Sequence, residues 1–349
     1  MKKFDYSFLN NGLLPAKLVN LTSGIYSLKT MANLRKEEYE KIFTELESIA
    51  KIQSVKSSNA IEGIVTSDER IKKIINGDSA PLNHDEAEIV GYRDALNQIH
   101  SNYGHIEFCE RDILSLHQIM MSYAGYEYGG KYKDNDNVIM EIDPSGNRKV
   151  RFRPTPASET KEAMEQLTLA YADASSDANI NQLLLIPCVI LDFLCIHPFR
   201  DGNGRMSRLL SLLLLYKNGF DAGKYVSFEE QINNYKGYYY EALRLSSDKW
   251  AENGNSYFPF IENFLSTLYM CYKELDKRFA VVNGGKVTKK ARIEATILNS
   301  LIPISKAEIC KILPDVSPTT VESVLSAMCR EGLIIKIGAS RSTRYIRNK

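Results

Sequence analysis

Two strongly apolar segments, residues 183–196 and 206–214, lie close together in the chain and constrain its fold more than any other feature. In the first segment apolar side chains surround almost the whole helix, and in the second they follow the helical spacing i, i+3, i+4, i+7. Pro198 disfavours continuation of the first helix through His197. The pattern therefore predicts two buried helices joined by a short polar loop at residues 200–203.

Most other segments before residue 280 also show helical spacing, so we expect a mainly α body. The 349 residues are 44% hydrophobic and 25% charged, which excludes collagen-like, disordered and coiled-coil chains. One exception to the helical spacing is residues 138–152, where two β-prone runs flank a Pro-Ser-Gly-Asn turn. This segment predicts a β-hairpin, and by itself it would be a surface hairpin without a functional role.

The polar loop and the start of the second helix contain the residues best suited to bind a polyphosphate. Gly202 and Gly204 precede or open a helix, where backbone N–H groups face outward at the positive end of the helix dipole. Arg205 and Arg208 lie three residues apart on one helix face, so their guanidinium groups can hold two phosphate groups. This pattern indicates an anion site.

Two further groups in the same stretch favour catalysis. Asp201 beside phosphates suits Mg²⁺, which binds one or two carboxylates together with phosphate oxygens. His197 has an unperturbed pKa of about 6.5 and is the natural general base. The alternative is a purely structural elbow, in which Asp201 and Asn203 cap helices and both arginines are solvated. The concentration of such groups within residues 197–208 favours a triphosphate site with a base.

The charge distribution separates the C-terminal region from the rest. Residues 281–349 carry a net charge of +7, whereas the preceding 280 residues carry −6. Gly284 and Gly285 indicate a linker, and behind it the sequence predicts three short helices and two strands. The helix starts are marked by a capping box at Ser305 and Glu308, and by Ser317 followed by Pro318. Three helices and a hairpin resemble a winged helix-turn-helix domain.

Residues 197–208 match every defined position of the signature H-x-F-x-[D/E]-G-N-[G/K]-R-x-x-R, so the chain resembles the Fic family. The resemblance implies a Fic-type helical core in which the hairpin is a flap that positions the target. It also implies that His197 deprotonates a target hydroxyl and that Asp201 binds Mg²⁺. The implied phosphate ligands are Gly202, Asn203, Gly204, Arg205 and Arg208. Related Doc kinases resemble this pattern with Lys at the position of Gly204, so Gly204 favours nucleotidyl transfer.

Residues 58–63, Ser-Asn-Ala-Ile-Glu-Gly, resemble the autoinhibitory pattern [S/T]-x-x-x-E-[G/N] of the same family. The resemblance implies an inhibitory helix that carries Ser58 and Glu62 ahead of the core. Glu62 would pair with Arg208 and so occupy the arginine intended for the γ-phosphate. Without the active-site motif, the same pattern would be an ordinary helix end.

Tyr239 and Tyr240 resemble the residues that line the adenine side of the nucleotide in relatives. Aromatic residues at helical spacing are more often part of a core, and the sequence leaves both readings open. The other histidines, His84, His100, His105 and His117, do not cluster, and we interpret them as structural or solvated.

The resulting hypothesis is a protein adenylyltransferase that transfers AMP from ATP, with Mg²⁺, to a Ser, Thr or Tyr hydroxyl of a target protein. One alternative is removal of AMP at the same site, and another is a DNA-binding regulator that uses the C-terminal domain. A protein is the other partner that this domain could bind, and the sequence does not decide whether the chain forms a homodimer. We expect a cytoplasmic protein without a membrane anchor, divided into an N-terminal helical region (1–90), a Fic core (91–280) and a winged helix (286–349).

Overall fold

The buried apolar side chains fall into two separate clusters, a large one between Tyr6 and Leu275 and a small one between Ile293 and Ile334. The computed structural model describes residues 2–142, 148–280, 288–298, 303–313, 316–338 and 343–348. These residues are mainly helical, as the sequence predicts. The domain boundaries at 90 and 286 stay predictions.

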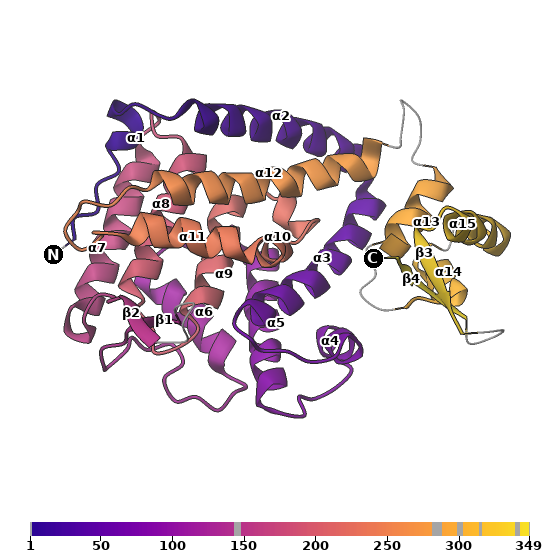
Figure 1. The fold of residues 1–349 in the computed structure, drawn as a ribbon, viewed down its shortest axis with the longest axis horizontal. Coiled ribbons are helices and arrows are strands. Elements are labelled where there is room, and N and C mark those ends of the chain that lie inside the picture. The colour runs from indigo at the N-terminus through magenta and orange to yellow at the C-terminus, as the bar shows by residue number, and fades with distance from the viewer. Residues whose placement is uncertain are drawn as a thin grey trace.

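In the described residues up to 280, the chain forms a helical body with one β-hairpin. Its elements are α1 (Phe8–Asn11), α2 (Ala16–Glu38), α3 (Glu40–Ile61), α4 (Asp68–Ile75), α5 (His84–Asn102), α6 (Glu110–Met121), β1 (Ile139–Ile142), β2 (Arg148–Phe152), α7 (Ala157–Ser176), α8 (Gln182–Ile196), α9 (Asn203–Lys217), the 3-10 helix Ala222–Lys224, α10 (Phe228–Asn234), α11 (Lys236–Ser247) and α12 (Phe258–Ala280). The long helices α2 and α12 pack along each other at one side of the body (Figure 1).

The two apolar segments form α8 and α9, which lie in the centre of the body. Nearly every residue of both helices is buried, including Phe193 and Leu213 with no exposed surface. Such burial on all sides explains why α8 is apolar almost all round, whereas in α9 the polar side chains Arg205 and Arg208 are buried together with the apolar ones. The sequence prediction of two core helices with a sharp polar loop between them is confirmed, with α9 beginning at Asn203.

The expected hairpin is also confirmed. Strands β1 and β2 pair antiparallel, with Ile139 opposite Phe152 and Ile142 opposite Arg148. The turn residues 144–147 lie outside the described part of the chain. The hairpin places Ile139, Arg151 and Phe152 at the wall of the central cavity described below.

The C-terminal module contains the elements that the sequence predicts. They are α13 (Lys289–Leu298), α14 (Lys306–Ile312), α15 (Pro318–Arg330), β3 (Ile334–Ile337) and β4 (Arg344–Arg347), with the two strands antiparallel. The capping box at Ser305 and the Ser317 cap with Pro318 are present. The proposed linker at Gly284 and Gly285 lies outside the described residues, and assignment to the winged-helix class stays a prediction.

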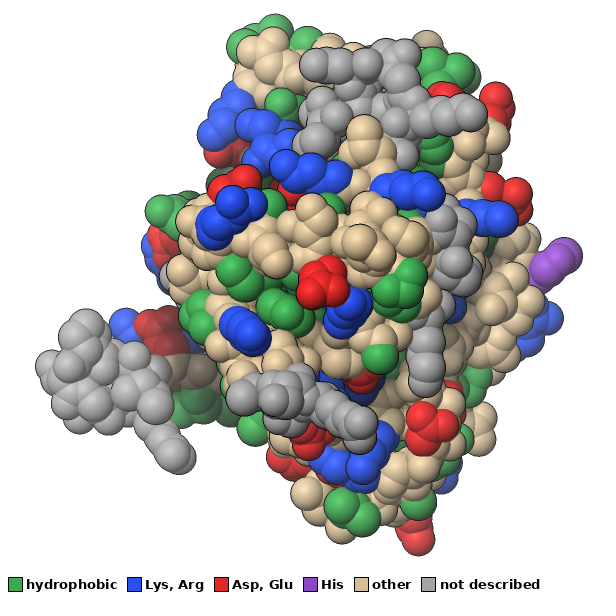
Figure 2. Space-filling model, turned by 90° about the vertical axis from the view of Figure 1, so that its right-hand side faces the viewer, with side chains coloured by type: hydrophobic (Ala, Val, Ile, Leu, Met, Phe, Trp, Pro, Cys, Tyr) green, Lys and Arg blue, Asp and Glu red, His purple; other side chains and the backbone are tan. Residues whose placement is uncertain are grey.

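The module stands at the end of the body, beyond α3 and α12 (Figure 1). On the face that Figure 2 shows, Lys and Arg side chains are interspersed with acidic and hydrophobic ones. Across α15 and its neighbour α14, Lys306 pairs with Glu322 at 2.5 Å, so one of the basic side chains of the module is already matched by an acid. Among the described residues, no helix is long and apolar enough to cross a membrane.

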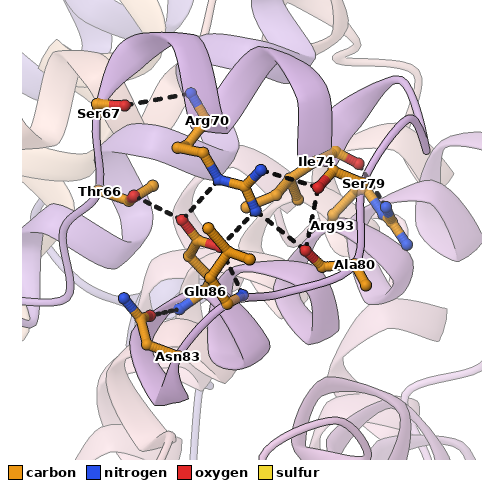
Figure 3. A network of polar contacts seen from close by, with 10 residues as sticks. Thr66, Ser67, Arg70, Ile74, Ser79, Ala80, Asn83, Glu86 and Arg93 are labelled. Atoms are coloured by element: carbon orange, nitrogen blue, oxygen red, sulfur yellow. Dashed lines mark hydrogen bonds and ion pairs between the residues drawn. The ribbon is translucent and has the colours of Figure 1, made fainter.

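A polar network fixes the segment that follows α3 (Figure 3). Arg70 of α4 donates to both carboxylate oxygens of Glu86 in α5, at 2.9 and 2.6 Å. The same carboxylate accepts from the Thr66 hydroxyl at 2.9 Å and from the Leu82 N–H at 2.8 Å. These bonds hold the pKa of Glu86 at about 2, with the Arg70 bond the largest cause. The chain just beyond Glu62 is therefore firmly attached to α5.

Candidate active site

His197 ends helix α8 in a left-handed conformation with φ of 52°, and its N–H donates to the Phe193 carbonyl at 2.9 Å. The following Pro198 prevents the helix from continuing, so the imidazole lies where the chain turns sharply. Burial is the larger cause and the nearby ammonium of Lys133 the next, and together they lower the pKa of His197 to about 4. The ring is therefore neutral at pH 7 and can accept a proton.

The loop after His197 is held by its own side chains. The Asn203 amide accepts from the Phe199 N–H at 2.9 Å and donates to the Phe199 carbonyl at 2.8 Å. The Phe199 ring is fully buried and stacks on His117 at 3.7 Å between ring centroids. His117 in turn donates from Nε2 to the Asp201 carbonyl at 3.1 Å, while its Nδ1 accepts from the Gly130 N–H. The side chain of Asn203 thus shapes the loop, and a role in holding phosphate falls to its backbone N–H.

The N-terminus of α9 is open to a ligand. Gly202 precedes the helix with φ of 80°, and no described residue accepts a hydrogen bond from the backbone N–H of Asn203, Gly204 or Arg205. A Cβ on Gly204 would lie 2.3 Å from Glu62 Oε1, so only glycine permits this close approach. Unpaired N–H groups at a helix start attract anions, and here a carboxylate lies close to Gly204 without accepting from these N–H groups.

That carboxylate belongs to Glu62, which caps the C-terminal end of α3. Arg208 Nη2 donates to Glu62 Oε1 at 2.7 Å and to the Ser58 carbonyl at 2.9 Å, while Nε donates to the Ser58 hydroxyl at 2.9 Å. Burial opposes the charge of Glu62, but Arg208 outweighs it and lowers the pKa of the carboxyl. Residues 58 and 62 therefore meet Arg208 as the sequence resemblance implies.

Arg205 is placed differently from Arg208. Its side chain is 1% exposed and lies 2.5 Å from Glu88 of α5 and 3.6 Å from Asp201. Both arginines are buried, which contradicts the solvated arginines expected in the structural-elbow alternative. Binding of a nucleotide phosphate by Arg205 stays a prediction, and it requires sharing the guanidinium with Glu88.

The Asp201 carboxylate lies at the outer edge of the loop and is 52% exposed. Its Oδ1 accepts from the Gly202 N–H at 2.6 Å. Among the described residues, no three acidic, His or Cys side chains gather into a metal cluster. A single accessible carboxylate beside an anion site fits Mg²⁺, which keeps several waters and takes its other ligands from phosphates. The residues present therefore fit this cation only together with a bound nucleotide.

A cavity of about 220 Å³ joins most of these groups. The sequence-predicted residues in its wall are Glu62, His197, Gly204, Arg208, Tyr239 and Tyr240. Tyr239 is 7% exposed and belongs to the core cluster, whereas Tyr240 is half-buried. Both readings of the tyrosines thus have support, because Tyr239 packs in the core while both side chains line the cavity. A larger groove, of about 670 Å³, lies between α11 and α12 and includes none of these six residues.

Two residues near the site were not singled out by the sequence. Lys133 donates from Nζ to the Ile196 carbonyl at 3.1 Å and from its N–H to the Pro198 carbonyl at 2.9 Å, so it brackets His197. Glu88 holds Arg205. Lys133 ends the segment Gly130-Lys-Tyr-Lys, which is a further part of the resemblance to the Fic family, whereas nothing in the local sequence marks Glu88.

Comparison with known proteins agrees with this geometry. Residues 107–215 match the model of the Fic/DOC family. The chain is 28% identical over 145 residues to a Fido domain-containing protein of Dictyostelium discoideum, covering 38% of this chain and 94% of that protein. It is 27% identical over 183 residues to a protein adenylyltransferase Fic of Nematostella vectensis, covering 49% of this chain and 39% of the relative. The solved structure of a Fic family protein from Desulfovibrio desulfuricans matches with a TM-score of 0.64 at 19% identity, covering 96% of this chain and 97% of that one. The chain therefore contains a Fic/DOC domain, matched over residues 107–215.

Proposed function

We propose that the chain is a protein adenylyltransferase that transfers AMP from ATP to a Ser, Thr or Tyr hydroxyl of a target protein and releases pyrophosphate. The observation that carries the proposal is one cavity whose wall includes a neutral His197, the open N-terminus of α9 at Gly204, and the buried Arg208. The N–H groups and the guanidinium bind and polarise phosphates, and the imidazole accepts the proton of the attacking hydroxyl.

The chain's own residues divide the reaction between them. His197 takes the hydroxyl proton at a ring nitrogen, a contribution that is typically worth about 10²–10⁴-fold in rate. The N–H groups at the start of α9 stabilise negative charge that develops on the phosphate oxygens. Arg208, and Arg205 if Glu88 releases it, hold the outer phosphates. Asp201 would hold Mg²⁺, which supplies charge neutralisation of the triphosphate when bound.

We further propose that Glu62 inhibits this reaction. Its carboxylate lies against Gly204 and Arg208, at the position where an outer phosphate would bind. With Glu62 in place the cavity holds about 220 Å³, which is below the 300 Å³ or so at the lower end of common ligand pockets. Removal of the carboxylate would free both the arginine and the space.

A second candidate function is removal of AMP from a modified target at the same site. The observation that favours it is that Glu62 and His197 line one cavity, where a carboxylate could orient a water for hydrolysis. This alternative predicts that Glu62→Gly loses hydrolysis, whereas inhibition by Glu62 predicts that it gains transfer.

The experiment is to incubate Glu62→Gly with each labelled nucleoside triphosphate and to identify protein adducts by mass spectrometry. We expect AMP on hydroxyl side chains. The matched control is the double variant with His197→Ala, which should bind ATP normally and transfer nothing. Adducts formed equally well without His197 would contradict the proposed mechanism. Chelation of divalent cations, or Asp201→Ala, should weaken transfer.

We expect the target protein to bring its hydroxyl side chain into the cavity beside the hairpin β1–β2, because this hairpin forms part of the cavity wall. Binding of DNA or protein through the C-terminal module, a homodimer and a cytoplasmic location stay predictions. For DNA, the test is binding of a duplex at low salt, which should fall steeply as salt rises through counterion release.

A further inference from the structure

Helix α8 ends at Ile196, immediately before the proposed base His197, and the last carbonyls of a helix have no partner within that helix. Lys133, from the segment between α6 and β1, reaches this helix end. Its Nζ donates to the Ile196 carbonyl at 3.1 Å and to the side-chain oxygen of Asn137 at 3.1 Å. The ammonium therefore lies at the negative end of the α8 dipole, where a positive charge is stabilising.

The burial of this lysine is unusual. Lys133 is 5% exposed, and among the described residues no carboxylate lies within ion-pair distance of its ammonium. Burial lowers the pKa of Lys133 to about 8 and Asp136 opposes this shift, so the side chain is still mainly protonated at pH 7. A buried cation whose hydrogen bonds go only to neutral oxygens is costly. An apolar side chain of the same length would avoid this cost, so packing alone does not account for a lysine here.

The same segment also holds the chain on the far side of His197. The Lys133 N–H donates to the Pro198 carbonyl at 2.9 Å. The Asn137 side chain donates to the Phe199 carbonyl at 3.3 Å. Residues 133 and 137 thus bind peptide groups before and after His197. These bonds matter because His197 has a φ of 52°, a left-handed conformation that is unfavourable for a residue with a side chain.

No described side chain orients the imidazole of His197 through a hydrogen bond. A catalytic base is usually oriented by a third group that bonds to it. Here the Nδ1 atom of His197 is buried, and no hydrogen bond to it forms within the described part of the chain. The direction of the ring therefore depends on the backbone at residue 197 and on the side chains packed around it. Lys133 is the charged group that fixes this backbone.

We propose that Lys133 is a positioning residue for AMP transfer, which directs His197 toward the attacking hydroxyl by holding the end of α8. The inference rests on the proposed function, because it assumes that His197 is the base. Lys133 is not among the described residues that line the cavity, so we assign it no contact with ATP or with the target. Asn137 assists by binding both the Lys133 ammonium and the Phe199 carbonyl.

The test uses Glu62→Gly as the active background and adds Lys133→Met, which keeps a side chain of similar length and the backbone N–H but removes the ammonium. Labelled AMP transfer is measured over a range of ATP concentrations, and the Kd of ATP is measured by calorimetry. We expect kcat to fall about 10-fold to 100-fold, as for a displaced catalytic group, while KM and Kd for ATP change by less than about twofold. Lys133→Arg keeps a charged donor and should restore part of the lost kcat.

The matched control is Lys224→Met in the same background. Lys224 Nζ also donates to a backbone carbonyl near the end of a helix, that of His100 in α5, at 3.1 Å. Lys224 does not line the cavity wall formed by the described residues. This control should lower the Tm and leave kcat unchanged, so thermal unfolding of every variant separates loss of stability from loss of catalysis.

A second variant keeps the test decisive if Lys133→Met does not fold. Asn137→Ala retains the lysine and removes the bond to the Phe199 carbonyl, so it should lower kcat in the same direction by a smaller factor, with the Kd of ATP unchanged. An unchanged kcat in the variant that folds would overturn the inference while the proposed function stands. A loss of kcat that Lys224→Met reproduces, or that is accompanied by an equal loss of ATP affinity, would overturn it as well. If Glu62→Gly itself transfers no AMP, the proposed function fails, and the inference fails with it.

Discussion

Glu62 and Glu86 lie 24 positions apart, and each pairs with an arginine, yet their surroundings differ in one decisive respect. Glu86 is 2% exposed, and its two oxygens accept four hydrogen bonds, from Arg70 twice, Thr66 and Leu82. The Glu62 side chain is 33% exposed, and among the described residues its carboxylate accepts from Arg208 alone. The first carboxylate is saturated, whereas the second keeps unused acceptor capacity next to a cavity.

This difference separates a structural ion pair from one that a ligand can displace. Removing a partner from the Glu86 network leaves a buried charge or several unpaired donors, which costs stability. Removing Glu62 leaves Arg208 with its bonds to Ser58 and exposes it to solvent or ligand in the cavity. The same type of pair therefore has opposite consequences, and mutation can distinguish them.

The largest expected effect separates the two partners of the Glu62 pair. Glu62→Gly should raise AMP transfer, including self-modification, because Arg208 and the start of α9 become free. Arg208→Ala also breaks the pair but loses the phosphate contact, so it should be inactive. We expect the two variants to differ by more than about 10²-fold in labelled AMP transfer, a range typical of losing a strong electrostatic contact in the transition state.

The double variant provides the control for this prediction. It should resemble Arg208→Ala, since relief of inhibition cannot act without the arginine. A purely structural pair would instead make both single variants less stable and neither more active. If Glu62→Gly stays folded and is no more active than the unchanged protein, the inhibitory role of Glu62 is wrong and a hydrolytic role becomes the better interpretation.

The next effect concerns stability at the saturated pair. Arg70→Ala should lower the free energy of unfolding by about 3 kcal/mol, because Glu86 keeps its charge in a buried place with half of its bonds. Urea unfolding followed by the fluorescence of Trp250, the single tryptophan, reports on the helical body alone. Lys17→Ala, which breaks the exposed pair with Glu262, should change the same free energy by less than about 1 kcal/mol. A similar loss of unfolding free energy in Arg70→Ala and Lys17→Ala would contradict the claim that the buried pair stabilises the fold more than an exposed one.

A smaller effect on the free energy of unfolding is expected at low pH. The pKa of Glu86 is about 2 in the folded protein and 4.5 when unperturbed. A lowered carboxyl pKa stabilises the folded state fully above the unperturbed value, and this contribution disappears as the pH falls from about 4.5 to about 2. The difference in unfolding free energy between the unchanged protein and Glu86→Gln should therefore shrink over this interval. A difference that stays constant down to pH 2.5 would show that the ionisation of Glu86 is not what stabilises the network.

The sequence predicted the pair between Glu62 and Arg208 but did not predict the pair between Arg70 and Glu86. Ser58 and Glu62 were found only because a family pattern links them to Arg208, which is 146 positions away. Glu86 and Arg70 carry no such pattern, since charged residues on amphipathic helices are usually solvated. Local sequence cannot show that two charges on different helices meet in a buried place.

The same reasoning explains the rest of the site. Helix ends and loops were predictable where one residue type decides the backbone, as at Pro198 after His197 and Gly202 before α9. The burial of Arg205 against Glu88 and the stacking of His117 on Phe199 depend on how α5 and α6 pack on the loop. Such contacts between distant segments follow from tertiary packing, for which the sequence offers no periodic signal.

The smallest expected effect tests how closely Glu62 lies against α9. In Gly204→Ala the new Cβ would lie 2.3 Å from Glu62 Oε1 and 3.4 Å from Arg208 Nη1, so the carboxylate must move. The methyl group also crowds the N–H groups that bind phosphate, which lowers activity in any background. Relief of inhibition occurs only when Glu62 is present, so the two consequences can be separated by a double-mutant cycle. For each background, the effect of Gly204→Ala is the ratio of AMP transfer with alanine to AMP transfer with glycine. This ratio should be about threefold to tenfold higher when Glu62 is present than in Glu62→Gly, which corresponds to a coupling of about 1 kcal/mol. The measurement is initial transfer of labelled AMP in all four proteins. Equal effects in the two backgrounds would mean that the carboxylate of Glu62 does not contact Gly204 in solution, and the pair would then resemble an ordinary surface ion pair rather than an inhibitor seated at the helix start.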